Sequence, residues 1–236
     1  MLETERLDQI MDYLRQKHTS TVAALSKRMF VSEATIRRDL TVLEQQGFVK
    51  RVYGGAVLVE SAQSELPLVL RAQQNSQSKS QIAAAAARHL RNGQTIFLDA
   101  SSTAMHLIRH FEAMQSLTIV TNGLKTAIEL QSLYQHTVYC TGGRMLHNSS
   151  AYVGAYAEDF IRHFNADIFF FSSRGVSDTG LITDASSDEN HIRRVMYEQS
   201  RKHVFLCDQS KVGKIYAYNL CTLQQVDDFI TDTPTL

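Results

Sequence analysis

The chain is 236 residues long, with 44% hydrophobic and 20% charged residues. This composition is typical of a soluble globular protein, and the length is enough for two domains. The 24 Lys+Arg residues balance 24 Asp+Glu residues, so the formal net charge is zero. The balance argues against a histone-like binder of polyanions, but a small DNA-binding domain with local positive charge is compatible with it.

The sequence carries neither a membrane segment nor a metal-binding cysteine pattern. No apolar run approaches the roughly 18 residues that a membrane span needs, and Glu3, Glu5 and Arg6 stand where a signal peptide would be apolar. The three cysteines fall in no CxxC or Cys/His spacing. We therefore expect a cytoplasmic protein with reduced thiols, no metal, no cofactor and no membrane partner.

Three helices are predicted in the first 46 residues. Apolar residues at i, i+3, i+4 and i+7 mark the buried stripe of the first helix: Leu7, Ile10, Met11 and Leu14. Ser20 is the expected N-cap of a short second helix. Ser32 is the expected N-cap of a third helix that reaches about Gln46, with Gly47 at its C-cap.

The third helix has two unlike faces. Ile36, Leu40 and Leu43 point together into the core, at roughly 100° per residue. The outer face and its flanks combine small, hydrogen-bonding and basic side chains: Ala34, Thr35, Arg37, Arg38, Thr41 and Gln45. Such a face suits a DNA major groove, because small residues allow close approach while Thr and Arg reach base edges and phosphates. The alternative interpretation is an ordinary amphipathic helix with a solvated outer face.

A basic hairpin follows this helix. Residues 48–53 predict a strand, Gly54-Gly55 a turn and residues 56–59 a second strand. Six basic and three acidic side chains between residues 19 and 58 give a local charge of +3. Three helices and a basic hairpin form a winged helix-turn-helix, whose hairpin can lie along the phosphate backbone. The candidate DNA contacts are Ser32, Ala34, Thr35, Arg37, Arg38, Thr41, Lys50, Arg51 and Tyr53.

The stretch VSEATIRRDLTVLEQQGFVKRVYGGAVL, residues 31–58, closely resembles the signature of DeoR-type bacterial transcriptional regulators. The match is long, ungapped and specific. The resemblance implies a sequence-specific regulator that binds operator DNA, by default a repressor whose effector relieves repression.

We predict a DNA-binding domain at residues 1–59, a linker at 60–78 and a second domain at 79–236. The linker is polar and contains Pro67, one of two prolines. Beyond it, short apolar runs alternate with helix-like segments. The predicted strands are residues 95–98, 117–120, 137–140, 167–171 and 204–207, with a candidate sixth at 229–230, and the predicted helices are 80–91, 103–111, 123–133, 151–164 and 188–201. This alternation predicts an α/β domain with a mostly parallel sheet.

Polar residues follow each of the first five strands, and in a parallel sheet such positions share the edge where ligands bind. Small hydroxyl and glycine residues leave backbone N–H groups for an anion, and three basic side chains supply positive charge. The candidate effector-binding residues from these strand ends are Asp99, Ser101, Ser102, Thr103, Thr121, Asn122, Gly142, Gly143, Arg144, Arg174, Gly175 and Lys211. For Arg174, a structural ion pair with Asp178 or Asp184 is the alternative.

The second domain resembles the DeoR-type sensor domain, which is related in fold to ribose-5-phosphate isomerase and binds phosphorylated sugars or similar effectors. Residues 99–103 match the family's phosphate loop, with Ser101-Ser102-Thr103 where the family usually has Gly-Thr-Thr. Residues 208–211 match its Asp-x-Ser-Lys element, and Glu189 matches its acidic helix start, which adds Glu189 to the candidates. The resemblance implies a regulator of sugar metabolism genes controlled by a phosphorylated sugar.

Two other functions fit parts of the sequence. An isomerase-like enzyme fused to a DNA-binding domain could use Asp99, Glu189 and Lys211 as acid–base groups. A fold does not confer its relatives' activity, and the attached winged helix favours sensing, so we expect no catalytic residues. A purely architectural DNA-binding protein would leave the polar sheet edge without a role.

Two further expectations concern histidines and assembly. His106 and His110 lie four apart on one predicted helix, but no third ligand accompanies them, so a structural role is preferred over a metal site. One small DNA-binding domain is usually too weak a binder alone. We therefore expect a homo-oligomer, a dimer or a tetramer, on repeated half-sites.

Overall fold

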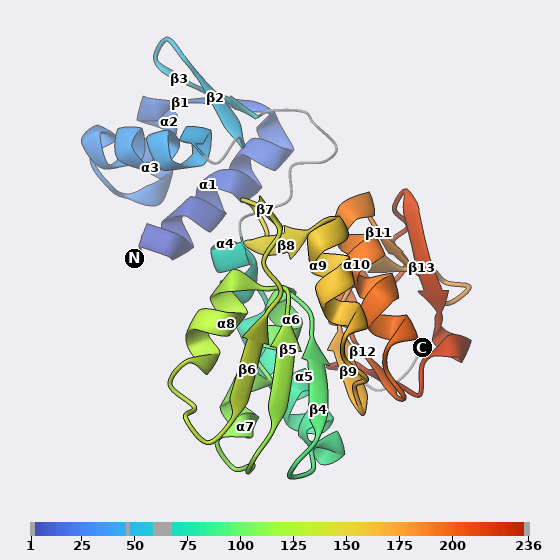
Figure 1. The fold of residues 1–236 in the computed structure, drawn as a ribbon. Coiled ribbons are helices and arrows are strands. Elements are labelled where there is room, and N and C mark those ends of the chain that lie inside the picture. The colour runs from blue at the N-terminus through green and yellow to red at the C-terminus, as the bar shows by residue number, and fades with distance from the viewer. Residues whose placement is uncertain (1–2, 46–47, 59–67, 234–236) are drawn as a thin grey trace. The chain divides into compact units, whose positions relative to one another are not determined.

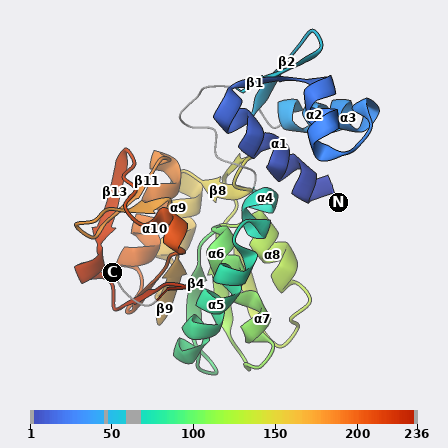
Figure 2. The same cartoon turned by 180° about the vertical axis from the view of Figure 1, so that it is seen from behind.

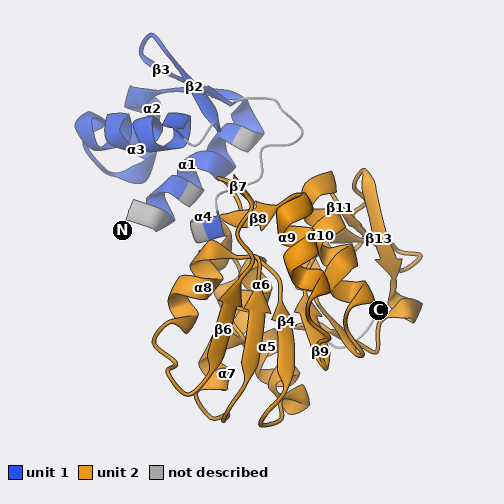
Figure 3. Cartoon of the chain, in the orientation of Figure 1, with its two compact units in different colours: residues 1–70 blue, residues 71–236 orange. Residues whose placement is uncertain are grey.

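The computed structural model describes residues 3–45, 48–58 and 68–233, which divide into two compact units, residues 1–70 and 71–236 (Figures 1 and 3). The division falls within helix α4 (Leu68–Gln73), inside the segment 60–78 that was expected to join the domains. Each unit has buried apolar clusters of its own. The two units are therefore described in turn.

The first unit is a winged helix-turn-helix, as predicted. Its elements are α1 (Glu3–Lys17), β1 (Thr19–Thr21), α2 (Val22–Met29), α3 (Glu33–Gln45), β2 (Val49–Val52) and β3 (Gly55–Leu58). The stripe of α1 that the apolar spacing predicted is buried, together with Ile36, Leu40 and Leu43 of α3. The hairpin β2–β3 is the wing, and its inner strand also pairs with β1, so the small sheet has the order β1-β3-β2.

The strand β1 corrects the predicted start of the second helix. Thr21, not Ser20, is the N-cap of α2, and its Oγ1 accepts the N–H of Ala24 at 3.1 Å. Ser20 is held in the ladder opposite Ala56, so its backbone is committed to the sheet. This close approach explains Gly55, because a Cβ at that position would lie 2.2 Å from the carbonyl oxygen of Ser20.

Other predictions in this unit concern the ends of α3. Ser32 caps the helix as expected, since its Oγ accepts the N–H of Thr35 at 3.2 Å. The first wing strand begins one residue later than predicted. β2 starts at Val49, and Phe48 is fully buried in the core. The predicted helix end at Gln46 and the Gly47 cap lie outside the described residues.

A buried ion pair fixes α1 to α3. Arg6 on α1 donates from Nε to Asp39 Oδ2 at 2.6 Å and from Nη2 to Oδ1 at 2.9 Å. The Asp39 side chain is 2% exposed, so the pair lies in the core of the unit. A bidentate guanidinium–carboxylate contact sets the relative orientation of the two helices as well as their spacing. Asp39 therefore positions the helix whose outer face is the candidate reading surface.

The second unit is built on a parallel sheet. Its strands are β4 (Thr95–Leu98), β5 (Thr118–Thr121), β6 (Thr137–Cys140), β9 (Ile168–Phe171), β12 (His203–Leu206) and β14 (Asp228–Ile230), all paired in parallel in the order β14-β12-β9-β4-β5-β6. All six predicted strands are confirmed within one or two residues. The order runs outward in both directions from β4 and β9, and ligands of such sheets bind at this point of reversal.

Both faces of the sheet are covered, as the continuous apolar strand at residues 168–171 predicted. One face packs against α5 (Ser76–Ala86), the 3-10 helix η1 (Ala87–His89), α6 (Ser102–Met105), α7 (Ile108–Phe111) and α8 (Leu124–Leu130). The other packs against α9 (Ala155–Arg162) and α10 (Ser187–Glu198). Figures 1 and 2 show the sheet between these layers from its two sides.

Several connections in this unit differ from the sequence prediction. The predicted helix at residues 103–111 is two short helices, α6 and α7, and the predicted helix at 151–164 begins only at Ala155, because Ala151–Val153 is a strand, β8, that pairs with β7 (Arg144–Leu146). A second small sheet, in the order β10-β11-β13, was not predicted. Its strands are β10 (Gly175–Val176), β11 (Leu181–Asp184) and β13 (Tyr218–Thr222).

We expect Asp39→Ala to lower the stability of the first unit by about 3–5 kcal/mol, because it leaves the Arg6 guanidinium buried without its carboxylate. Native-state hydrogen exchange of the α3 amides in the full chain measures this. The matched control is Glu33→Ala, which removes an exposed i,i+4 ion pair with Arg37 and should cost less than about 1 kcal/mol. Equal losses in the two variants would contradict the role assigned to the buried pair.

Candidate DNA interface and effector site

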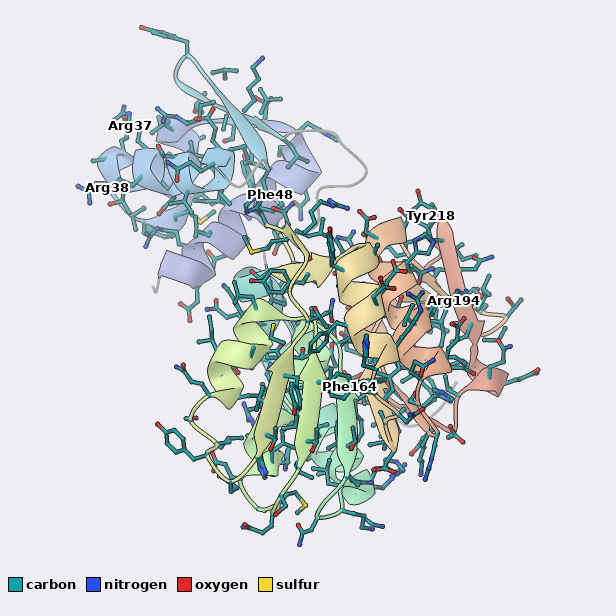
Figure 4. The ribbon with its side chains drawn as sticks, in the orientation of Figure 1. Arg37, Arg38, Phe48, Phe164, Arg194 and Tyr218 are labelled. Atoms are coloured by element: carbon teal, nitrogen blue, oxygen red, sulfur yellow. The ribbon has the colours of Figure 1, made fainter. Side chains whose placement is uncertain are left out.

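The outer face of α3 carries the basic residues predicted for DNA. Figure 4 labels Arg37 and Arg38 on this helix, and both side chains are exposed. Arg37 Nη2 donates to Glu33 Oε2 at 2.6 Å, an exposed contact that phosphate can replace at small cost. Within the part of the chain that the structure describes, Arg38 makes no ion pair. Its guanidinium is therefore available to a phosphate or a guanine edge.

The first turn of α3 supplies small polar groups beside these arginines. Ser32 and Ala34 are exposed and Thr35 is half-buried. The hydroxyls of Ser32 and Thr35 lie 2.9 Å apart, and Ser32 also accepts the Thr35 N–H. The Ser32 hydroxyl is thus committed to capping, which leaves the methyl of Ala34 as the surface that a base edge could approach.

The wing is tied to α3 through Thr41. The Thr41 hydroxyl donates to the carbonyl oxygen of Arg37 at 2.8 Å and accepts from Arg51 Nη1 at 2.8 Å. Glu44 adds a second tie by accepting the N–H of Arg51 at 2.8 Å. Thr41 and Arg51 therefore join helix and wing in the free protein, whereas exposed Lys50 is free to follow a phosphate.

Two exposed aromatic residues flank this surface. Tyr53, a predicted DNA contact, lies in the turn of the wing and its side chain is fully exposed. Phe30, which was predicted only as a break in the chain, caps α2 with φ 55° and is 92% exposed. No pattern in the sequence predicted the exposure of Phe30, because an apolar residue between two helices is normally buried.

The effector-site candidates meet where the strand order of the parallel sheet reverses. Asp99 follows β4 and Ser172 follows β9, and the Ser172 N–H donates to Asp99 Oδ2 at 3.3 Å. Asp99 Oδ1 accepts both the N–H and the hydroxyl of Ser101, at 3.1 and 2.5 Å. Asp99 is thus the buried link between two strand ends and the start of α6.

A buried arginine holds three carboxylates at this point. Arg193 donates from Nε to Asp99 Oδ2 at 2.9 Å and from Nη1 to Asp184 Oδ2 at 2.8 Å, and its Nη2 lies 3.9 Å from Glu189 Oε1. Burial alone would lower the pKa of Arg193, but the carboxylates of Asp184, Asp99 and Glu189 raise it above its ordinary value. The guanidinium is therefore a permanent cation. It keeps these acids together without repulsion.

Asp184 and Arg193 were not among the predicted site residues. Asp184 ends β11, a strand that the apolar pattern did not reveal. Burial would raise its pKa, but Arg193, the Ser186 N–H and the nearby Arg174 together lower it. Arg193 lies four residues after Glu189 on α10, and this spacing was the one available signal.

A small hollow opens beside this cluster. It is lined by Asp99, Ala100, Asn122, Glu189 and Arg193 and, in this conformation, is too narrow to hold a water molecule. Asn122 is 3% exposed, and its Nδ2 donates to the carbonyl of Tyr152 at 3.1 Å. Its Oδ1 has no hydrogen-bond partner among the described residues. A ligand donor such as a hydroxyl group can reach this buried acceptor only if the side chains around the hollow move apart.

Lys211 brings a cation to the other side of Ser172. It belongs to the 3-10 helix η2 (Gln209–Lys211), and its Nζ donates to Ser172 Oγ at 2.7 Å and to Thr103 Oγ1 at 3.3 Å. Asp208 Oδ2 lies 3.7 Å from the same ammonium. A lysine ammonium surrounded by hydroxyls at the edge of a sheet can bind a phosphate or carboxylate oxygen.

The predicted phosphate loop holds its geometry through serine. Ser101 is the N-cap of α6, and its hydroxyl accepts the N–H of Ala104 at 3.2 Å while it donates to Asp99. Ser102 and Thr103 then open the helix, both buried. The hydroxyl of Ser101 therefore links Asp99 to the start of α6, at the position where the family usually has glycine.

The remaining candidates have structural partners. Thr121 Oγ1 accepts the N–H of Gly123 at 3.0 Å, and Gly142-Gly143 connects β6 to β7. Arg144 reaches the start of α10, where its Nη2 lies 2.6 Å from Asp188 Oδ2. These residues surround the hollow rather than line it.

Arg174 and Gly175 pack the loop that follows η2. The Arg174 guanidinium lies 5.9 Å from the ring centre of Tyr216, and its charge contributes to lowering the pKa of Asp184. A Cβ on Gly175 would lie 2.4 Å from the carbonyl oxygen of Lys214. These contacts favour the structural alternative for Arg174, with Asp184 rather than Asp178 as its acidic neighbour.

Of the histidine pair, His106 lies at the break between α6 and α7, and His110 lies within α7. His106 Nε2 donates to the carbonyl oxygen of Ala72 at 3.2 Å, and its Nδ1 lies 3.2 Å from Ser80 Oγ. Burial lowers the pKa of both His106 and His110. Both ring nitrogens of His106 are engaged within the protein, which agrees with the structural role preferred above. None of the described helices is long and apolar enough to cross a membrane.

Two protein-family models match nearly the whole chain. Residues 6–62 match the DeoR-like helix-turn-helix domain, and residues 74–233 match the DeoR C terminal sensor domain. The HTH-type transcriptional regulator GolR of Listeria innocua is 37% identical over 232 residues, 98% of this chain and 91% of that protein. GlpR of Haloferax volcanii, also an HTH-type transcriptional regulator, is 34% identical with the same coverage. The Escherichia coli glycerol-3-phosphate regulon repressor is 29% identical over 99% of this chain and 92% of its own length.

The fold, the site and these relatives define a two-domain DNA-binding transcriptional regulator with a sensor domain, and not an enzyme. The chain belongs to the DeoR family.

Solved structures resemble the fold more distantly. The structure of eIF2B delta from Chaetomium thermophilum aligns with a TM-score of 0.51 at 15% identity, over 71% of this chain and 60% of its own. Ribose 5-phosphate isomerase A from Methanocaldococcus jannaschii aligns with a TM-score of 0.43 at 16% identity, over 58% of this chain and 55% of its own. The chain thus spans little more than half the length of these two proteins.

We expect the contribution of Asp208 to stability to depend on pH. Burial would raise its pKa, but Lys211 and Ser210 lower it below the ordinary value. A carboxyl with a depressed pKa stabilises the fold above its unfolded value of about 4 and loses this effect as the pH falls through the folded value. Asp208→Asn should therefore be less stable than the parent at pH 7, and urea denaturation should show the difference shrinking below about pH 4. A difference that stays constant down to pH 2.5 would contradict this origin.

Proposed function

We propose that this regulator represses sugar metabolism genes in the cytoplasm and is released from operator DNA by a phosphorylated sugar or a closely related metabolite. The observation that carries the proposal is the pairing of Lys211 with the hollow at the point where the strand order reverses. Ser172 joins them, since its N–H donates to Asp99 and its hydroxyl accepts from Lys211.

The two halves of this site have opposite polarity. Lys211, with the hydroxyls of Thr103 and Ser172, offers positive charge and donors, which suit a phosphate. The hollow contains Asn122 Oδ1, which has no hydrogen-bond partner among the described residues, and opening of the hollow on binding would present this oxygen to a sugar hydroxyl. A small molecule with an anionic end and a hydroxylated end matches both. The name of the Escherichia coli relative, a glycerol-3-phosphate regulon repressor, agrees with this class of effector.

Operator recognition is assigned to α3 and the wing. The exposed face of α3, between Ser32 and Thr41, enters the major groove, with Arg37 and Arg38 as the main basic contacts, while Lys50, Arg51 and Tyr53 of the wing lie along the backbone. One such domain buries little surface, so we propose a homo-oligomer that places two or more of them on repeated half-sites. The effector acts only if it binds the DNA-free arrangement more tightly than the DNA-bound one.

We expect the double variant Arg37→Ala/Arg38→Ala to lose operator binding, by roughly a hundredfold or more, because each contact to a base or phosphate contributes about 1–3 kcal/mol. Fluorescence anisotropy with a DNA duplex selected by the parent protein from a random pool measures the loss. Arg201→Ala, an exposed arginine of the second unit, is the control. An unchanged affinity of the double variant would show that α3 is not the reading helix.

We expect a phosphorylated sugar to raise the melting temperature of the parent protein, since a ligand at a hundred times its Kd adds about 2.7 kcal/mol of stability. The panel is ribose 5-phosphate, glucose 6-phosphate, fructose 6-phosphate, fructose 1-phosphate and glycerol 3-phosphate, with inorganic phosphate and the unphosphorylated sugars beside them. Lys211→Ala should abolish the ligand-induced shift, whereas Lys214→Ala, an exposed lysine of the neighbouring loop, should keep it. If no phosphorylated compound shifts the parent, the proposed effector class is wrong.

A further inference from the structure

The junction between α4 and α5 lies on the only covalent route from the DNA-binding unit to the sensor unit. α4 contains Leu70, where the first unit ends, and α5 begins at Ser76. Asn75 is the N-cap of α5 and adopts the left-handed conformation, with φ 53° and ψ 34°. Asparagine tolerates this conformation better than most residues, so the sharp turn costs little here.

Asn75 hydrogen-bonds to the start of η2, the 3-10 helix that contains Lys211. Its Nδ2 lies 3.3 Å from Asp208 Oδ1 and 3.3 Å from Ser210 Oγ. The other oxygen of Asp208 faces the Lys211 ammonium at 3.7 Å. One carboxylate therefore contacts both the cation of the proposed effector site and the turn that begins α5.

A second connection runs from the phosphate loop. Thr103, which accepts from Lys211, lies in α6, and His106 follows directly after that helix. His106 Nε2 donates to the carbonyl oxygen of Ala72 in the last turn of α4. Two partners of the Lys211 ammonium are thus linked to the α4–α5 junction. Asp208 contacts Asn75 directly, and Thr103 lies three residues before His106, which donates to Ala72.

A buried lysine completes the junction. Lys79 is 3% exposed, and its Nζ donates to the carbonyl oxygens of Arg71 and of Gln74, the latter at 2.6 Å. With His106 on Ala72, two carbonyls of α4 and that of Gln74, which follows the helix, accept from side chains of the sensor unit. The end of α4 is therefore fixed to the sensor unit by groups that depend on the position of α5 and α6.

We propose that Asn75 and His106 are positioning residues that couple the effector site to α4, and thereby to the DNA-binding unit. The proposal rests on the proposed function, because it takes the anionic end of the effector to bind at Lys211. An anion at Lys211 competes with Asp208 for the ammonium. The Asp208 carboxylate then changes its contact with Asn75, and the turn that anchors α4 moves with it. The coupling is the difference in free energy between the two arrangements of this junction.

The first test uses Asn75→Gly, which removes the amide and keeps a residue that adopts the left-handed conformation freely. Gln77→Ala, an exposed amide removed from the same segment, is the matched control. The readout is the ratio of DNA affinities without and with each saturating sugar phosphate of the panel above, together with the Kd of that compound for DNA-free protein. His106→Gln is measured in parallel, because its amide can still donate to Ala72.

In the parent we expect a ratio of about 5–150, the usual range of allosteric coupling. Asn75→Gly should reduce this ratio at least fivefold, while the effector-free DNA affinity and the Kd of the sugar phosphate stay within twofold of the parent values. Gln77→Ala should keep the parent ratio, and His106→Gln should keep most of it. A parental ratio in Asn75→Gly would overturn the proposal.

The second test needs no ligand. Hydrogen exchange of the backbone amides at residues 71–79 is compared between the parent, Lys211→Ala and Lys214→Ala. We expect exchange to accelerate severalfold in Lys211→Ala alone, because Asp208 loses the cation on one side of the shared carboxylate. Unchanged exchange would overturn the coupling even if a sugar phosphate binds. If exchange accelerates in Lys211→Ala but the parent binds no compound of the panel, the coupling is supported and the proposed effector class is refuted.

Discussion

Arg193 stands at the centre of the sensor domain because three acids converge on it from different segments of the chain. Asp99 follows β4, Asp184 ends β11 and Glu189 opens α10, and none of these carboxylates could be buried so close to the others without a cation between them. A planar guanidinium can donate to two of them at once. These elements also share one apolar cluster, in which Phe97 of β4 and Ile182 of β11 are buried with Ile192 of α10.

The first unit uses a similar arrangement for a different purpose. There the Arg6–Asp39 pair fixes the orientation of a helix whose outer face stays open to solvent. In both units a buried arginine–carboxylate contact supplies geometry that apolar packing does not, since apolar side chains tolerate sliding and rotation. Most of the residues assigned to DNA are exposed, whereas most of those assigned to the effector are buried.

The sequence was informative wherever one pattern decided the structure. Continuous apolar runs predicted the strands of the parallel sheet, and the residues after them predicted Asp99, Asn122 and Lys211 at its edge. The sequence was uninformative where a contact between residues far apart in the chain determined the local structure. Thr21 replaced Ser20 as a helix cap because Ser20 pairs with the wing, and Asp184 was missed because β11 is stabilised by pairing with β10 and β13 rather than by an apolar pattern of its own. The family resemblance covered both domains, but the contacts of Asn75 with Asp208, across 133 residues, could come only from the structure.

The strand order of the sensor sheet also has a consequence for synthesis of the protein. The first unit ends at Leu70, whereas the site between Asp99 and Lys211 cannot close until β12 has paired with β9. At about 5–20 residues per second, the ribosome needs on the order of ten seconds to pass from the one to the other. During that interval a nascent chain carries the winged helix-turn-helix without a complete sensor domain. A chain that ended before β12 would carry the DNA-binding unit without a complete sensor domain, so translation of the last strands is itself a condition for sensing.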